Sequence, residues 1–397
     1  MKDAPPLQLS WPWRAGCHAS IQAGGMRYLP HIRIALNEAS ESIDIELYMC
    51  SSGALFDEWL RAIRAARKRG VRVRMLLDAI GSRELDEKDQ QALRDAGVQL
   101  EWFNPLRLWR PLHALVRDHR KLIIVDNRRA WTGGMGINDS YDPRIHGEEA
   151  WLDAMVEIHG PVVADFSALF EQAWQLARRE LFPHPIRWRM QWQHTPPAGK
   201  RKGRASWARV NAARGGRNNP LLRTMVRRIL RARSSVWLCT PYFLPPRSLQ
   251  KALLHAGRRG VTVNLTLAGP ETDHPVIRHA GHHLYTELLD AGVIIHEYMP
   301  RFMHLKAARV DNWSTLGSFN YDRWNSNWNL EANVEIVDQD FSDQMEKLRQ
   351  QLENDCQLIE TGRWGSRSSL KRWHGGFWYW FGTRLIRHLR SLWRNTG

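Results

Sequence analysis

The hydrophobic and polar positions follow the same order in the two halves of the chain. "RKRGVRVRMLLDA" (67–79) and "GRRGVTVNLTLAG" (257–269) each run from charged positions through a glycine into a mostly apolar stretch. "DAGVQLEWFNP" (95–105) and "DAGVIIHEYMP" (290–300) share a second pattern of this kind. A glycine between a polar helical end and an apolar run predicts a helix, a stop and a buried strand. The repetition predicts an internal duplication.

Each repeat is expected to form an α/β layer with a mixed sheet. We place the first half at residues 1–186, the second at 221–362 and a C-terminal segment at 363–397. The stretch between the halves, 187–220, carries Pro, Gly and a dense run of positive charge. We therefore predict a basic, solvated linker for most of it. A basic lip over an anionic surface is the alternative interpretation.

The C-terminal stretch "FWYWFGTRLIRHLRSLWR" (377–394) has a helical pattern of its own. A helix packed on the protein core is one interpretation. Aromatic residues gathered at one end and Arg on the polar face favour a helix lying in a membrane interface. At 100° per residue one face is predicted to hold Trp378, Phe381, Leu385, Leu389 and Leu392, and the opposite face Arg384, Arg387, Arg390 and Arg394.

The overall composition narrows the class of partner. The chain has 397 residues, a formal net charge of +16 and 20 Trp. This excess of positive charge favours a polyanionic partner, either nucleic acid or an anionic membrane. Composition does not distinguish between the two. The four cysteines form no CxxC pair, which argues against a zinc site or a disulfide framework. The N-terminus lacks an apolar signal core and no apolar run is long enough to span a membrane, so we expect a cytoplasmic protein.

Two related motifs carry the candidate chemistry, "HRKLIIVD" (119–126) and "HLKAARVD" (304–311). In a strand, residues two apart leave the same face, so each motif presents a His and a Lys together. Small residues that follow would let the backbone approach a ligand, and an Asn would supply a donor. The candidates are His119, Lys121, Gly133, Gly134 and Asn138 in the first repeat, and His304, Lys306, Gly317, Ser318 and Asn320 in the second.

Two histidines on facing strands suit the cleavage of a phosphodiester. One imidazole can attack phosphorus while the other, protonated, gives its proton to the leaving oxygen. Lysine and asparagine would offset the charge on the other phosphoryl oxygens, so neither a metal nor another cofactor is expected. Asp126 and Asp311 stand at strand ends and are expected to cap turns. Asp153 and Glu331, in following strands, are the expected partners of the imidazoles, with Glu331 orienting His304.

These paired motifs resemble the phospholipase D superfamily. "IDIELYMC" (43–50) and "TPYFLPP" (240–246) make the resemblance strongest to bacterial cardiolipin synthases of the short, peripheral type. It implies two similar α/β/α sandwich halves with the site on a pseudo-twofold interface. It also implies a phosphohistidine intermediate, with His119 as nucleophile and His304 as general acid. The chain departs from the family at Gly134, where many members have Ser. The stretch between Asp311 and Gly317 is also one residue shorter than usual.

The favoured hypothesis is a phosphatidyltransferase at the cytoplasmic face of the bacterial inner membrane. It would make cardiolipin or a related lipid from phosphatidylglycerol or similar substrates. Alternatives are hydrolysis of phospholipid, a metal-independent nuclease of the same superfamily, and a non-catalytic membrane-binding protein. Nucleic acid is not favoured as partner, and a monomer suffices because one chain holds both half-sites. Candidate substrate contacts, for which packing roles are an equal alternative, are Tyr242, Asp273, His274 and Tyr285.

Overall fold

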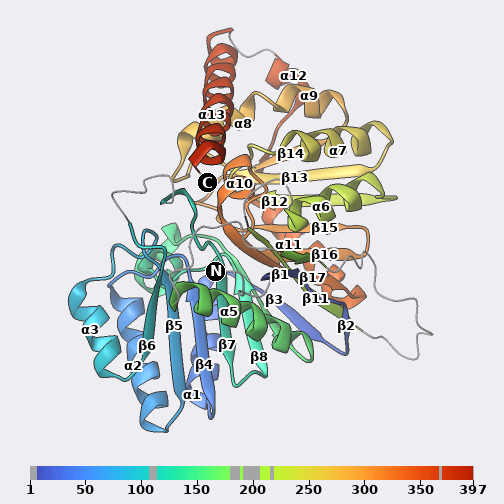
Figure 1. Ribbon diagram of the computed structural model, residues 1–397. Coiled ribbons are helices and arrows are strands. Elements are labelled where there is room, and N and C mark those ends of the chain that lie inside the picture. Colours follow the sequence, from blue (N-terminus) through green and yellow to red (C-terminus); the bar gives the residue numbers. More distant parts are fainter. Residues whose placement is uncertain are drawn as a thin grey trace.

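The strands form two sheets, and helices cover them (Figure 1). Each repeat forms most of one sheet, with the first repeat at the lower left of the view and the second at the upper right. The short strands at Leu7–Ser10 and Arg14–Ala15, predicted to belong to the first half, pair in the second sheet. The computed structural model describes residues 7–106, 114–178, 188–190, 206–214, 219–365 and 369–396.

The first sheet contains both the first motif and the strand that follows it. Helices α1 (Gly25–Glu38), α2 (Ala54–Lys68) and α3 (Glu87–Asp95) precede the motif, and α5 (Val162–Arg178) follows it. Three short helical segments lie between β8 and β9: η2 (Asp139–Tyr141), α4 (Pro143–His146) and η3 (Gly147–Glu149). The strand order is β3 (His18–Ala23), β9 (Ala154–His159), β8 (Arg129–Gly133), β7 (Lys121–Val125), β4 (Ser42–Leu47), β5 (Arg72–Asp78) and β6 (Gln99–Phe103).

The second sheet repeats this order and adds strands at its edges. Its order is β10 (Trp188–Met190), β1 (Leu7–Ser10), β11 (Trp207–Arg214), β17 (Leu330–Val337), β16 (Trp313–Gly317), β15 (Ala307–Val310), β12 (Ser235–Thr240), β13 (Thr262–Ala268), β14 (Ile294–Tyr298) and β18 (Cys356–Leu358), and β2 (Arg14–Ala15) also pairs with β11. The helices of this half are α6 (Pro220–Leu230), α7 (Arg247–Arg258), α8 (Pro275–His282), α9 (Tyr285–Asp290), α10 (Arg323–Trp328), α11 (Gln339–Asn354), α12 (Thr361–Gly365) and α13 (Ser369–Thr396).

The predicted duplication is confirmed strand by strand. β4, β5 and β6 pair in parallel, as do β12, β13 and β14. The next three strands of each sheet, β7, β8 and β9 in the first and β15, β16 and β17 in the second, pair antiparallel. Gly70 and Gly260, which stop α2 and α7, have φ angles of 88° and 81°. These left-handed conformations favour glycine and turn the chain from helix into strand. The predicted α/β class with two similar halves is therefore confirmed.

The two halves share one hydrophobic core. Buried side chains of α5 and β9, such as Phe166 and Val156, belong to the same cluster as Val210 of β11 and Met345 of α11. Two further clusters lie within the individual repeats. A shared, close-packed core holds the two sheets in a fixed relation, because such interiors resist deformation. Side chains from different repeats can therefore form one site.

The prediction of a solvated linker was wrong for residues 207–214. They form β11, which pairs with β17 along its length, and Ala208, Val210 and Ala212 are fully buried. Arg209 is also buried because its guanidinium pairs with Glu335 at 2.7 Å. The strand is buried on both faces. The sequence did not reveal it, because an arginine buried with a partner cannot be told in sequence from an exposed one. Residues 191–205 and 215–218 lie outside the described residues.

The C-terminal helix is confirmed and packs on α8. A Cβ on Gly375 would lie 3.0 Å from the His279 carbonyl oxygen, so close packing favours glycine there. The Arg384 guanidinium lies 5.0 Å from the ring of Trp380, which stands one turn earlier in the helix. The side chains of Arg387, Arg390, Leu392 and Arg394 lie outside the described residues. The opposite side of the helix exposes Phe377, Trp380, Phe381 and Leu385.

No helix in the described part of the chain combines the length and apolarity needed to cross a bilayer.

Candidate active site

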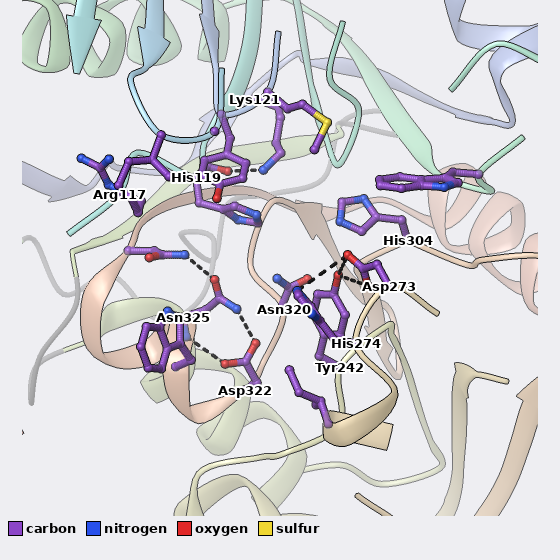
Figure 2. Close-up of a pocket in the computed structure, with 18 of the residues that line it drawn as sticks. Arg117, His119, Lys121, Tyr242, Asp273, His274, His304, Asn320, Asp322 and Asn325 are labelled. Atoms are coloured by element: carbon purple, nitrogen blue, oxygen red, sulfur yellow. Dashed lines mark hydrogen bonds and ion pairs between the residues drawn. The ribbon is translucent and has the colours of Figure 1, made fainter. Parts of the chain in front are cut away.

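Each motif begins where its strand touches the other repeat. The His119 amide donates to the Leu330 carbonyl at 2.9 Å, and the Leu330 amide donates to the Arg117 carbonyl at 2.8 Å. The equivalent bonds join His304 and Leu152 at 2.8 Å, and Leu152 and Phe302 at 2.9 Å. These two reciprocal bridges bring His119 and His304 to the same cavity (Figure 2).

The carboxylate partners of the histidines are crossed between the repeats. Nδ1 of His119 lies 3.0 and 3.1 Å from the two carboxylate oxygens of Glu331. Nδ1 of His304 lies 2.7 Å from Asp153 Oδ2. The prediction that Glu331 orients His304 was therefore wrong. The bridges explain why, because each sets one repeat's carboxylate strand beside the other repeat's histidine. With Nδ1 engaged, Nε2 of each ring is the atom left for chemistry at phosphorus.

The two carboxylates have different surroundings. The Ser318 hydroxyl donates to Glu331, so the shorter spacing after Asp311 does not misdirect it. In the first repeat a Cβ on Gly134 would lie 2.1 Å from Asp153 Oδ2, which leaves no room for a serine. Asp153 instead accepts from the Ala154 amide at 2.7 Å. The absence of a serine hydroxyl at position 134 therefore goes together with the close approach of the Asp153 carboxylate to the Gly134 backbone.

A tyrosine that sequence reasoning missed completes the His304 side. The Tyr141 hydroxyl lies 3.2 Å from His304 Nδ1 and donates to the Gly134 carbonyl at 3.2 Å. On the other side the Tyr48 ring lies 4.9 Å from the His119 ring, and Lys121 Nζ lies 5.1 Å from the same tyrosine ring. Both tyrosines line the cavity. Tyr48 belongs to the stretch 43–50 on which the resemblance was based. A single tyrosine gave no sign in the sequence that it would line the active site.

Both lysines are buried beside their histidines. Lys121 Nζ donates to the His119 carbonyl at 2.6 Å, and Lys306 Nζ donates to the His304 carbonyl. Burial lowers the pKa of Lys121 to about 7 and that of Lys306 to about 8, although nearby carboxylates oppose the shift. Each ammonium is therefore poorly solvated, and an anionic ligand would stabilise its charge.

The buried surroundings of both histidines disfavour their charged form in the unliganded cavity. Burial holds the pKa of His119 well below its ordinary value, and the Lys121 and Lys306 charges add to the effect. Burial and the same two lysines act on His304. Burial also raises the pKa of Asp153 to about 6. A bound phosphodiester anion would oppose the repulsion between lysine and imidazole and so favour a protonated imidazole.

The two asparagines are not equivalent. Asn320 lines the cavity, and its buried Oδ1 has no hydrogen-bond partner among the described residues. Asn138 does not line the cavity. Its amide donates to the Ser51 hydroxyl at 2.8 Å and its Oδ1 accepts from the Ser140 amide at 2.9 Å. Asn138 therefore holds the loop after β8, whereas Asn320 is available to a ligand.

The two motif aspartates lie at the far ends of their strands. Asp126 accepts backbone N–H bonds from residues 40–42, and Asp311 accepts them from residues 233–235. Their φ angles are 53° and 52°. These contacts fit the turn-capping role expected for them. Gly133 and Gly317 have matching constraints, since a Cβ on either would lie 2.2 Å from a backbone carbonyl of the neighbouring strand.

The cavity has a volume of about 500 Å³ and includes three of the four candidate substrate contacts. Tyr242, Asp273 and His274 line it, and the Tyr242 hydroxyl donates to both Asp273 oxygens at 2.7 Å. Tyr285 is not among them. It is buried and donates to Glu297 at 2.9 Å, so its size and hydroxyl serve packing. Further lining residues that sequence reasoning missed are Arg117, Trp151, Asp322, Trp324, Asn325 and Asn329.

Comparison with known proteins agrees with this geometry. A family model described as "Cardiolipin synthase, PLD-like domain" matches residues 32–174 and 225–353. Cardiolipin synthase B of Escherichia coli K12 is 31% identical over 354 residues, which are 88% of this chain and 83% of that protein. The chain belongs to the cardiolipin synthase family. It is a phosphatidyltransferase with a phospholipase D-like fold, and its place is in phospholipid biosynthesis.

Other relatives of this cardiolipin synthase family member extend the likeness. Cardiolipin synthase A of Pseudomonas putida W619 is 29% identical over 342 residues, which are 85% of this chain and 68% of that protein. The crystal structure of phosphatidylserine synthase from Haemophilus influenzae Rd KW20 superimposes with a TM-score of 0.71. The match covers 94% of both chains at 14% identity, so it bears on the fold alone.

Proposed function

We propose that the protein makes cardiolipin, or a closely related phospholipid, through a phosphohistidine intermediate. The observation that supports this is the facing pair of buried histidines, each held through Nδ1 by the other repeat's carboxylate. One ring can act on phosphorus while the other acts on the alcohol oxygen. Such a division needs two histidines at one cavity, which is where the two repeats bring them.

The first step forms a covalent intermediate. Nε2 of His119 bonds to phosphorus as the bond from phosphorus to the headgroup oxygen breaks, and His304 gives its proton to that oxygen. The positive charges of Lys121 and Lys306 offset the charge that builds on the other phosphoryl oxygens. The side-chain amide of Asn320 lines the same cavity and can hydrogen-bond the phosphoryl group.

The second step transfers the phosphatidyl group to an acceptor. His304, now neutral, takes the proton of the acceptor hydroxyl. The oxygen of that hydroxyl bonds to phosphorus as the bond from phosphorus to His119 Nε2 breaks. With phosphatidylglycerol as both donor and acceptor the products are cardiolipin and glycerol. Transfer outcompetes hydrolysis only when the acceptor is held where water would otherwise enter.

The exposed face of α13 supports a lipid surface as the site of reaction. Trp380 is 50% exposed and Phe381 45%, and Arg384 stacks on Trp380. Aromatic rings beside a guanidinium match the boundary between headgroups and acyl chains. The net charge of +16 adds attraction to anionic lipid. We therefore propose peripheral binding to the anionic cytoplasmic face of the membrane, with α13 as the contact.

Lipid analysis after incubation with phosphatidylglycerol vesicles tests the reaction. Mass spectrometry should detect cardiolipin, with glycerol released in equal amount. Denaturant quenching at mildly alkaline pH, where a phosphohistidine is stable, should trap a phosphatidylated peptide that contains His119. The parent and His304→Ala are both supplied for this with a phosphatidyl donor whose activated aryl group leaves without a proton. Phosphatidic acid as the sole lipid product would refute transfer and leave hydrolysis.

A matched pair of variants tests the membrane contact. Leu385 and Leu230 are both 42% exposed, but only Leu385 lies on the α13 face. Leu385→Asp should weaken sedimentation with anionic vesicles about tenfold, because it removes an apolar contact and adds a repelled charge. Leu230→Asp should bind like the parent. Equal binding by both variants would contradict the assignment of α13.

A further inference from the structure

The two ends of the catalytic cavity are related by the duplication but differ in chemistry. Counting back two residues from each histidine gives Arg117 in the first repeat and Phe302 in the second. Counting back two from each orienting carboxylate gives Asn329 beside Arg117 and Trp151 beside Phe302. The reciprocal bridges through Leu330 and Leu152 make these pairs structurally equivalent. One end is therefore polar where the other is aromatic.

Arg117 offers a buried cationic donor at the polar end. It is only 6% exposed, and its Nε and Nη2 donate to the carbonyls of Val116 and Asn104 at 2.7 and 2.5 Å. Nη1 lies 3.4 Å from Asp78 Oδ1 but has no hydrogen-bond partner among the described residues. Asp78 accepts hydrogen bonds from three backbone amides, so both of its carboxylate oxygens have partners without Nη1. A buried donor without a partner is costly unless a ligand completes it.

A relay of amides fixes the acceptor next to it. An ionised Asp322 can only accept, so the NH₂ group of Asn325 must point to it. The Asn325 carbonyl then accepts from the Asn329 NH₂ group, as found. This order leaves Asn329 Oδ1 as a buried acceptor with no hydrogen-bond partner in the described part of the chain. Figure 2 shows Asp322 and Asn325, the first two members of this relay, beside the cavity.

The opposite end is suited to an apolar group. The rings of Trp151 and Phe302 meet edge to face with centroids 5.0 Å apart, and Trp151 lies 5.5 Å from the His304 ring. Tyr242 and Ile277 belong to the same small hydrophobic cluster. Trp151, Tyr242 and Ile277 of this cluster line the cavity, and Phe302 packs against Trp151 without lining it.

We propose that Arg117 and Asn329 form a subsite for the acceptor lipid's own phosphate and its neighbouring hydroxyl, distinct from the phosphate that His119 attacks. Arg117 supplies a charged donor for a phosphate oxygen, and Asn329 accepts from a hydroxyl. The ligand is thus a phosphate ester of a polyol, and the proposal assigns it to a lipid headgroup. Exposed Arg83 adds positive charge at this wall, and Glu84 is the carboxylate beside it. The proposal rests on the proposed transfer reaction and extends it to the choice of acceptor.

Two acceptors that differ by one phosphate test the subsite. A phosphatidyl donor with an activated aryl leaving group is supplied, and transfer to glycerol and to glycerol phosphate is measured by mass spectrometry. Arg117→Gln should lower kcat/KM for glycerol phosphate about tenfold or more, as expected for a lost charge-assisted hydrogen bond. Transfer to glycerol should change less than about twofold. Asn329→Asp should act in the same direction, because it sets a negative charge against the phosphate.

Three comparisons make the outcome decisive. Arg128→Gln removes the same charge from an exposed ion pair with Glu41 and should leave the acceptor preference unchanged. Equal losses for both acceptors in Arg117→Gln would mean a structural role and overturn the subsite. Phosphatidylglycerol vesicles identify the source of the phosphate. An effect on glycerol phosphate but not on this lipid would overturn the assignment to a headgroup.

A binding measurement separates this proposal from the transfer reaction. Calorimetric titration with glycerol phosphate needs no turnover, and Arg117→Gln should bind it about tenfold more weakly than the parent. If the parent only hydrolyses its donor, the proposed transfer fails while the titration still decides the subsite. Equal affinity in the parent and in Arg117→Gln would refute the subsite even if transfer occurs.

Discussion

The crossed pairing of carboxylates and histidines predicts different fates for two similar substitutions. Glu331→Gln removes the charge that holds His119, and Asp153→Asn removes the one that holds His304. Both carboxylates are fully buried, and breaking a buried ion pair costs about 3–5 kcal/mol. An amide keeps the shape and one acceptor, so the lower value applies. About 3 kcal/mol in the transition state corresponds to a loss of about 10² in kcat with the natural donor.

The assay compares two leaving groups in single turnovers. With a lipid headgroup the departing alkoxide needs a proton, whereas an activated aryl group leaves without one. Because Asp153 serves the proposed acid His304, Asp153→Asn should recover most of its lost rate with the aryl donor. Because Glu331 serves the proposed nucleophile His119, Glu331→Gln should stay about 10² slower with both donors.

One outcome would refute this reasoning. Recovery by Glu331→Gln and not by Asp153→Asn would mean that the nucleophile and acid roles are reversed, or that the partners are not crossed as found. Double variants with His119→Ala distinguish these cases. If the pairs are crossed, Glu331→Gln and His119→Ala are coupled in their effects on the free energy of unfolding in urea, whereas Asp153→Asn and His119→Ala are additive.

Three further predictions concern pH, packing and stability. The kcat/KM profile should be bell-shaped, because the Asp153 carboxylate is lost as pH falls through about 6 and the Lys121 ammonium is lost as it rises through about 7. An alkaline limb near the ordinary lysine pKa of about 10.4 would contradict it. Gly134→Ser should reduce kcat at least about tenfold without unfolding the protein, since the Asp153 carboxylate must move, and thermal melting with kinetics checks this. Arg209→Met should lower the free energy of unfolding in urea by about 3 kcal/mol by leaving buried Glu335 without its cation, and a change below about 1 kcal/mol would contradict it.

The sequence alone was sufficient for the duplicated fold and for the members of the His and Lys pairs. The helix, glycine and strand patterns are local, and the side chains of residues two apart in a strand share a face wherever that strand lies. The same local logic indicated that Asp126 caps a turn. It failed for residues 207–214, because an arginine paired in the core looks in sequence like one in solvent.

Tertiary structure alone decided which residues act together. Glu331 serves His119 because reciprocal bridges through Leu330 and Leu152 cross the repeats, and no local pattern encodes that crossing. The same bridges set Arg117 beside Asn329, although the two are far apart in the chain. Local periodicity thus determined the elements and the faces they present. The packing of one repeat against the other determined the partners, because contacts between distant segments depend on the whole shared core.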